Sequence, residues 1–415
     1  MPDDRYRGSW ECFEGAQRLI GGAHHLSGRP LVPDQPPLYL ARGKGCRVVD
    51  VDGHEYIDYV MAYGAYVLGY ADDEVDAAAF AQARRGSLLS LNHPVHLRFA
   101  ERLLAWFPAA DMAMFVKTGS EATTAALRIA RRATGRRKVA RCGYHGWHDW
   151  CLPLEPFVPE GLAEQVLEFS AADPSSLARV LAEHPGEIAA VIVAPEMVVP
   201  GRPEPLRELA ALTRAAGALL VLDEIKTGFR IRPGSVQRLW DLRPDLTTVS
   251  KALGNGWPVA AVLGRREVME HAAGLHCSAT YHGDTMAMAA AMRTLELVEE
   301  RGVLEHVWMQ GQRLIDGLAA AAARHGLPMQ AYGEPLPPMP MLRVTLTDAA
   351  ARDAIAHAFF REMMARGVLL HPRHLWFVSH AHGAAEIDAT LERADEAMAA
   401  TVRACGELLD HIPPA

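Results

Sequence analysis

The sequence lacks the features of membrane proteins, secreted proteins and nucleic-acid binders. No run approaches the roughly 18 uncharged apolar residues that a membrane helix needs. The first residues, Met1 to Arg7, contain no apolar stretch of the kind that secretory signals carry. The formal net charge is -8, so the surface would on balance repel phosphates. We therefore expect neither a membrane nor a nucleic acid among its partners.

Cysteine is scarce, and no two cysteines form a Cys-x-x-Cys pair. The six cysteines stand at positions 12, 46, 142, 151, 277 and 405. In a large chain without a signal, scattered cysteines are typically reduced, mostly buried thiols. These observations predict a cytoplasmic protein.

Internal repeats and low-complexity linkers are also absent from the 415 residues. Half of the residues are hydrophobic and 22% are charged, which supplies ample core material for an ordinary globular protein. Domains of about 100–200 residues are usual, so two or three lobes are expected. We predict a large domain at 61–300 and a small α+β domain at 301–415. An N-terminal arm and hairpin at 1–60 would contribute to the small domain.

Local patterns predict the elements of these lobes. Residues 47–59 are typical of a β-hairpin that turns at Asp52-Gly53. From about residue 98 to 300, short apolar runs alternate with Ala-rich helical patterns, which predicts an α/β fold with a mostly parallel central sheet. The predicted strands include Met112–Val116, Ile188–Val193, Ala218–Leu222, Thr247–Ser250 and Val259–Leu263. A helix is expected from Thr285 to Glu300, followed by strands at 342–346, 367–370 and 375–378 and helices near 349–366 and 384–410.

An acid and an amine follow two consecutive strands of this predicted sheet. Asp223 comes directly after the first strand, and Lys251 comes directly after the second. Ligands of open α/β sheets bind in the crevice beyond the carboxyl ends of the strands. An acid and an amine placed there suit pyridoxal 5'-phosphate (PLP), because a lysine can form an imine with its aldehyde and an aspartate can hold a proton on its pyridine nitrogen. Taken singly, Asp223 could be a helix cap and Lys251 a surface lysine.

The segment Lys117-Thr118-Gly119-Ser120-Glu121 follows another predicted strand and opens a helix. Gly119 permits an unusual backbone angle, and Ser120 can cap the helix and offer a hydroxyl. The free N–H groups and the positive end of the helix dipole make such a helix start an anion site. A plain strand-to-helix turn capped by serine is the alternative.

A polar and aromatic loop runs from Tyr144 to Asp149. An aromatic ring in this loop could stack on a planar cofactor, or it could pack over the sheet edge. His145 and His148 could instead form a metal pair. Zinc needs three or four convergent ligands, so we predict no metal.

Taken in order, these segments resemble the class III aminotransferases, PLP enzymes of fold type I. The chain is most similar to their glutamate-1-semialdehyde aminomutase-like branch. The resemblance covers nearly the whole chain, and four separated motifs agree in order and spacing. It implies a large domain with a mostly parallel sheet, a smaller α+β domain, and a homodimer whose active sites lie at the subunit interface.

The resemblance implies roles for the strand-end residues. Lys251, in Ser-Lys-Ala-Leu-Gly-Asn-Gly-Trp-Pro, matches the lysine that binds PLP covalently and moves protons. Asp223, in Asp-Glu-Ile-Lys-Thr-Gly-Phe-Arg, matches the partner of the pyridine nitrogen. Ile225 matches the aliphatic residue beneath the ring.

The resemblance also implies roles for four loop and helix-start positions. Gly119 and Ser120 match the phosphate cup. Tyr144 matches the stacking aromatic residue, with His145 beside it. Thr280 matches a threonine that reaches the phosphate from the neighbouring subunit.

Three departures from the family pattern bear on the substrate. Many relatives have Glu-Pro-Val where this chain has Ala194-Pro195-Glu196, so the acid is shifted by two positions. Lys226 stands where Gly, Met or Gln is commoner, and Arg29 is out of register with the arginine of an N-terminal Ser-Pro-Val-Arg segment. The proline-acid turn and the segment around Lys226 are similar to aminotransferases that act on oxidised amino sugars.

These patterns predict a PLP-dependent aminotransferase. It would move an amino group from an amino-acid donor, glutamate, to an aldehyde or ketone acceptor such as an oxidised amino sugar or other secondary metabolite. The alternative is a glutamate-1-semialdehyde-type 2,1-aminomutase or a PLP-dependent epimerase. A non-catalytic PLP-fold binding protein is disfavoured because both Lys251 and Asp223 are present.

Overall fold

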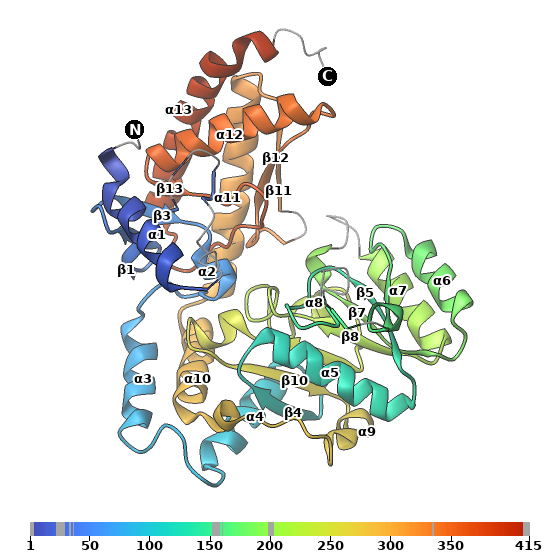
Figure 1. Ribbon diagram of the computed structural model, residues 1–415. Coiled ribbons are helices and arrows are strands. Elements are labelled where there is room, and N and C mark those ends of the chain that lie inside the picture. The colour runs from blue at the N-terminus through green and yellow to red at the C-terminus, as the bar shows by residue number, and fades with distance from the viewer. Residues whose placement is uncertain are drawn as a thin grey trace. The chain divides into compact units, whose positions relative to one another are not determined.

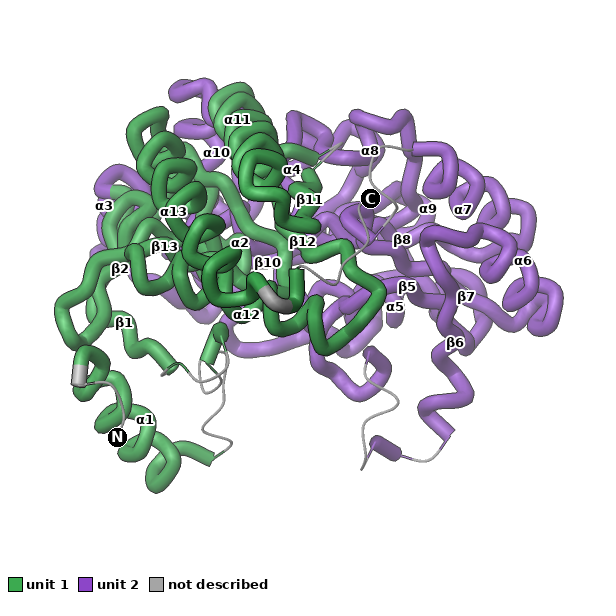
Figure 2. Tube along the Cα trace, turned by 90° about the horizontal axis from the view of Figure 1, so that it is seen from above, with its two compact units in different colours: residues 1–72, 305–415 green, residues 73–304 purple. Residues whose placement is uncertain are grey.

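A computed structural model describes residues 4–21, 30–32, 35, 37–151, 158–159, 161–197, 203–333 and 336–409. The chain divides into two compact units, drawn in different colours in Figure 2. One unit comprises residues 73–304, and the other joins residues 1–72 to residues 305–415. Within the described ranges, no helix is long and apolar enough to cross a membrane.

The unit of residues 73–304 is built on a seven-stranded sheet (Figure 1). The strand order is β4-β10-β9-β8-β7-β5-β6, and β10 alone is antiparallel to its neighbours. The predicted α/β class with a mostly parallel sheet is confirmed. The strands are β4 (Met112–Val116), β5 (Lys138–Cys142), β6 (Val166–Glu168), β7 (Ile188–Val193), β8 (Leu219–Asp223), β9 (Leu246–Val249) and β10 (Ala260–Gly264).

Helices pack on this sheet and bury its central strands. Every residue of β7 is buried, which explains why its sequence is a continuous apolar run without alternation. Helix α5 lies against β7 to β10 through a face of small residues, among them Ala122 and Ala126. The other helices are α3 (Asp73–Ala83), α4 (Pro94–Trp106), α6 (Pro174–Glu183), α7 (Glu204–Ala215), α8 (Ser235–Leu239), α9 (Arg266–Met269) and α10 (Thr285–Glu300), and α5 spans Gly119–Thr134.

The second unit contains a four-stranded sheet of order β1-β2-β3-β13 and a two-stranded sheet, β11-β12. The predicted hairpin is present, with β2 antiparallel to β3. Leu314, Phe359, Trp376 and Met398 are fully buried in its core. The strands are β1 (Leu40–Lys44), β2 (Arg47–Asp50), β3 (Glu55–Asp58), β11 (Met329–Tyr332), β12 (Met341–Val344) and β13 (Val368–Leu369). The helices are α1 (Arg7–Leu19), α2 (Met61–Gly64), α11 (Val303–Arg324), α12 (Ala349–Ala365) and α13 (Ala384–Leu409).

The predicted strand at 375–378 is wrong. The segment belongs to none of the strands in the described part of the chain. The N–H of Trp376 bonds to the carbonyl of Pro340 at 2.8 Å, and the N–H of Phe377 bonds to the carbonyl of Tyr59 at 2.8 Å. Both acceptors lie just outside strands, Tyr59 after β3 and Pro340 before β12, so these bonds do not extend a ladder.

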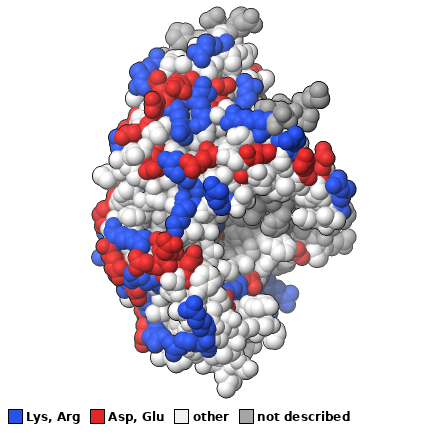
Figure 3. Space-filling view, turned by 90° about the vertical axis from the view of Figure 1, so that its left-hand side faces the viewer, with Lys and Arg blue, Asp and Glu red and all other residues white. Residues whose placement is uncertain are grey.

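The surface carries charges of both signs. On the face that Figure 3 shows, acidic and basic side chains are interspersed. Exposed side chains of opposite sign also form ion pairs, for example Arg324 with Asp395 at 2.6 Å. Exposed pairs contribute at most about 1 kcal/mol each. Stability must therefore come mainly from the two cores.

Candidate active site

Lys251 stands two residues after the end of β9, at the first residue of a short 3-10 helix, η4 (Lys251–Gly254). Its φ is +52°, a left-handed conformation that is uncommon outside glycine and is concentrated at functional sites. Burial lowers the pKa of Lys251 to about 8, and the nearby ammonium of Lys226 adds to this effect. A substantial fraction of the amine is therefore neutral, and nucleophilic, near neutral pH.

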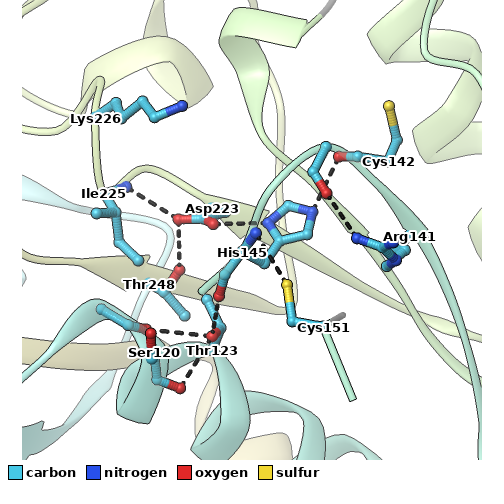
Figure 4. Close-up of polar contacts among 12 residues, drawn as sticks. Ser120, Thr123, Arg141, Cys142, His145, Cys151, Asp223, Ile225, Lys226 and Thr248 are labelled. Carbon is cyan, nitrogen blue, oxygen red and sulfur yellow. Dashed lines mark hydrogen bonds and ion pairs between the residues drawn. The ribbon is translucent and has the colours of Figure 1, made fainter. Parts of the chain in front are cut away.

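Asp223 ends the neighbouring strand β8, and its side chain is 4% exposed. Its Oδ1 accepts hydrogen bonds from the Thr248 hydroxyl and from the N–H of Ile225, both at 3.1 Å (Figure 4). Its Oδ2 lies 2.7 Å from Nδ1 of His145. These three partners hold the carboxylate in one orientation.

His145 is buried and bridges Asp223 to the end of β5. Its Nε2 lies 2.9 Å from the carbonyl oxygen of Cys142, which can only accept a hydrogen bond. Since Nδ1 faces a carboxylate, both ring nitrogens are satisfied when each carries a proton. The ring thereby ties the Asp223 carboxylate to the backbone at the end of β5.

The start of helix α5 leaves amide groups available to an anion. Thr118 caps the helix, because its hydroxyl accepts from the N–H of Glu121 while the Glu121 carboxylate accepts from the N–H of Thr118 at 2.8 Å. The amides of Gly119 and Ser120 belong to the first turn and have no partner within the helix. A phosphate placed there would meet these N–H groups and the positive end of the helix dipole.

Two glycines allow the site's segments to approach closely. A Cβ on Gly119 would lie 2.8 Å from Cδ1 of Ile225, and a Cβ on Gly146 would lie 2.4 Å from Oγ of Ser120. Gly146 also has a φ of +120°, which L side chains rarely adopt. The hydroxyl of Thr123 secures the loop from the helix side by donating to the carbonyl of His145 at 2.7 Å. Any side chain on these glycines would push the loop and Ile225 away from the helix start.

The structure thus brings six of the candidate residues together in one unit: Gly119, Ser120, His145, Asp223, Ile225 and Lys251. Two others lie on its surface. Tyr144 is 56% exposed, and Thr280 is exposed in η6 (Thr280–Gly283). An ion pair of 2.7 Å between Lys117 and Asp284 links the segment after η6 to the strand end that precedes α5.

Sequence reasoning missed one partner of the site and the pairing of two others. Thr248 was not predicted to hold Asp223, although a threonine in a fully buried strand signals a hydrogen-bond partner. Lys226 and Glu196 were noted only as departures from the family pattern, but they form an ion pair at 2.9 Å. Arg29 lies outside the described residues.

The chain is similar to known proteins in both sequence and fold. The family model described as aminotransferase class-III matches residues 32–382. The chain is 34% identical over 404 residues to 3-aminobutyryl-CoA aminotransferase of Cloacimonas acidaminovorans, covering 94% of this chain and 96% of that protein. It is 33% identical to glutamate-1-semialdehyde 2,1-aminomutase of Persephonella marina, covering 94% and 97%. The solved structure of the FumI protein of Sphingopyxis sp. MTA144 in a PLP form has a TM-score of 0.88 at 30% identity, covering 99% of each chain.

The residues present fit PLP. A buried carboxylate with fixed partners is available for a protonated ring nitrogen, and a capped helix start is available for a phosphate. Gly119 and Gly146 keep open a cradle that a Cβ would fill. A buried lysine with a lowered pKa is available for an aldehyde.

Proposed function

Because the chain belongs to the class III aminotransferases, we propose that it transfers an amino group from glutamate to an aldehyde or ketone acceptor. The acceptor in this proposal is an oxidised amino sugar or other secondary metabolite. The observation that carries the proposal is the placement of Lys251 and the fixed Asp223 at the carboxyl ends of two adjacent strands, beside the capped start of α5. The departures at Glu196 and Lys226 support an unusual acceptor.

PLP, when bound, supplies an aldehyde that captures amino groups and a ring that accepts an electron pair from the substrate carbon. In the proposed mechanism Asp223 would hold the proton on the ring nitrogen, and His145 would keep the Asp223 carboxylate in position through their 2.7 Å contact. The amine of Lys251 would remove the proton from the α-carbon of glutamate and would be the group that returns it to the C4′ carbon of the cofactor. A lysine serves as such a base only when its pKa is depressed, as that of Lys251 is.

The Gly119–Ser120 amides would bind the phosphate, and Ile225 would pack beneath the ring. These contacts would fix the cofactor so that its reacting carbon stays within reach of Lys251. Tyr144 would stack on the ring. Each of these roles is tested by measuring PLP affinity in the corresponding alanine variant, with Gly119 changed to valine.

Amino transfer is tested with 15N-labelled glutamate. We expect the label to appear in the amine product of an added aldehyde or ketone. An aminomutase or epimerase would convert its substrate without any added donor, and the second relative, 33% identical, bears an aminomutase name. Turnover that is independent of glutamate would therefore replace the proposed function with this alternative.

We also propose a homodimer in which Thr280 reaches the phosphate in the neighbouring subunit's site. The exposed position of Thr280 supports this. Subunits carrying Lys251→Ala and subunits carrying Thr280→Ala can be refolded together to test it. Each mixed dimer would contain one intact site, so the mixture should be more active than either variant alone. A mixture no more active than its parts would contradict a shared site.

The same proposal places the enzyme in the cytoplasm. All six cysteines are free, which suits a reducing compartment. Fractionation of cells that produce the protein would test this location.

A further inference from the structure

A buried ion pair lies at the same edge of the sheet as Lys251 and has no role in the steps above. Nζ of Lys226 is 2.9 Å from Oε1 of Glu196, and the two side chains are 15% and 3% exposed. Lys226 follows β8, while Glu196 lies in η3 (Pro195–Met197), which follows the parallel neighbour β7. Figure 4 shows Lys226 on the segment that also carries Asp223 and Ile225.

The pair is electrostatically close to the reacting amine. Burial is the main cause of the lowered pKa of Lys251. The Lys226 ammonium lowers that pKa further, whereas the carboxylates of Glu196 and Asp223 oppose the effect. Removing two charges from water costs several kcal/mol per ion, so a buried pair is weak evidence for stability. Its position beside Lys251 suggests a functional reason for keeping it.

One carboxylate oxygen of Glu196 finds no hydrogen-bond donor among the described residues. Its Oε2 is buried and accepts no hydrogen bond from any residue within the described ranges. An ionised oxygen left unsatisfied in the interior is costly, and a hydrogen-bond donor supplied by a ligand would remove that cost. Lys226 already balances the charge of Glu196. A neutral donor therefore suits Oε2 better than a second ammonium beside Lys226, and a carboxylate would be repelled by it.

We propose that Oε2 of Glu196 accepts a hydrogen bond from a hydroxyl group that the substrate carries beside its reacting carbonyl. Lys226 is a positioning residue that holds the Glu196 side chain in place through the 2.9 Å ion pair. The substrate class is then hydroxylated aldehydes and ketones, in preference to their alkyl counterparts. This inference rests on the proposed function, because it assigns a substrate group to that same site. A site built to bind a hydroxyl discriminates strongly against an analogue that lacks it, since its acceptor is left unpaired.

The test uses two ketones, hydroxyacetone and 2-butanone, which differ by a hydroxyl in place of a methyl group. The holoenzyme is first bleached with glutamate, and the return of its yellow absorbance is followed at increasing concentrations of each ketone. We expect hydroxyacetone to react with an apparent second-order rate constant roughly tenfold to a hundredfold greater than that of 2-butanone. The difference should lie mainly in the half-saturating concentration.

The variant is the double change Glu196→Met with Lys226→Met. It removes both charges together, so that no buried charge is left unpaired, and buried pairs are often replaced in this way without loss of folding. The preference for hydroxyacetone should fall to near one. The matched control is Lys138→Met with Glu187→Met. This change removes a 2.8 Å pair at the amino ends of β5 and β7, away from the carboxyl ends where Lys226 and Glu196 lie. The control should keep the preference.

The outcomes distinguish a failure of the hydroxyl inference from a failure of the proposed function. A preference that survives in the double variant, or a bleached enzyme that reacts with neither ketone, would overturn the hydroxyl inference and leave the glutamate reaction standing. A wild-type protein that glutamate fails to bleach would instead overturn the proposed function.

Discussion

The lowered pKa of Lys251 predicts how the apoprotein takes up PLP as the pH changes. Only a neutral amine attacks an aldehyde. At pH 7.5 a lysine with the ordinary pKa of 10.5 is about 0.1% neutral, whereas one with a pKa of about 8 is roughly a quarter neutral. The rate of uptake should therefore rise about tenfold per pH unit below 8 and level off above it.

The assay is stopped-flow absorbance at the yellow band after apoprotein and PLP are mixed, from pH 6 to pH 10. Nα-acetyl-lysine, measured alongside, reports the ionisation of PLP itself and the behaviour of an ordinary amine. The ratio of the two rates should be largest at low pH and should decline above the break near pH 8. A second check is Lys226→Met, which removes a cation that lowers the pKa of Lys251 and should move the break upward. If the rate of PLP uptake by the protein rose through pH 10 in parallel with that of Nα-acetyl-lysine, the pKa of Lys251 would not be lowered.

Three further predictions follow from the geometry around the site. Gly146→Ala places a Cβ 2.4 Å from Oγ of Ser120 and should weaken PLP binding at least about tenfold in a fluorescence titration. The control is Gly135→Ala, because Gly135 also has a positive φ but has open space around it, and this change should leave PLP binding unaltered. Asp223→Ala should keep a yellow band but bleach with glutamate about a hundredfold more slowly, since the ring nitrogen loses its fixed partner; an unchanged rate would contradict the role given to this acid. Burial raises the pKa of Glu224 from 4.5 to about 7. The contribution of this side chain to the free energy of unfolding is therefore fully present below pH 4.5 and is lost as the pH rises through 7. Urea unfolding should show the stability advantage of wild type over Glu224→Gln shrinking by about 3 kcal/mol between pH 4.5 and pH 8, and a pH-independent difference would count against a buried neutral carboxyl.

Several elements could be predicted from the sequence because local pattern decides them. Met112–Val116, Ile188–Val193 and Thr285–Glu300 have the predicted bounds. The two strands are short apolar runs bounded by turn residues, and the helix begins directly after its cap, Asp284. In each case the segment and the residues next to it in the sequence carry the whole signal.

Other features depend on parts of the chain that meet only in the folded protein. Residues 375–378 bond to residues near 59 and 340, which lie far away in the sequence, so the apolar pattern of the segment could not show that it forms no strand. The Lys226–Glu196 pair joins the ends of two different strands, and neither residue alone indicates the other. The same holds for Thr248, whose hydroxyl donates a hydrogen bond to Asp223 on the neighbouring strand.

An absorbance spectrum of the purified protein with PLP, taken before and after glutamate is added, most directly tests whether Lys251 binds PLP and whether glutamate donates the amino group. We predict a yellow band that bleaches to the pyridoxamine form with glutamate and is absent from Lys251→Ala. A yellow band that persists unchanged in Lys251→Ala, or no band in wild type, would contradict this prediction.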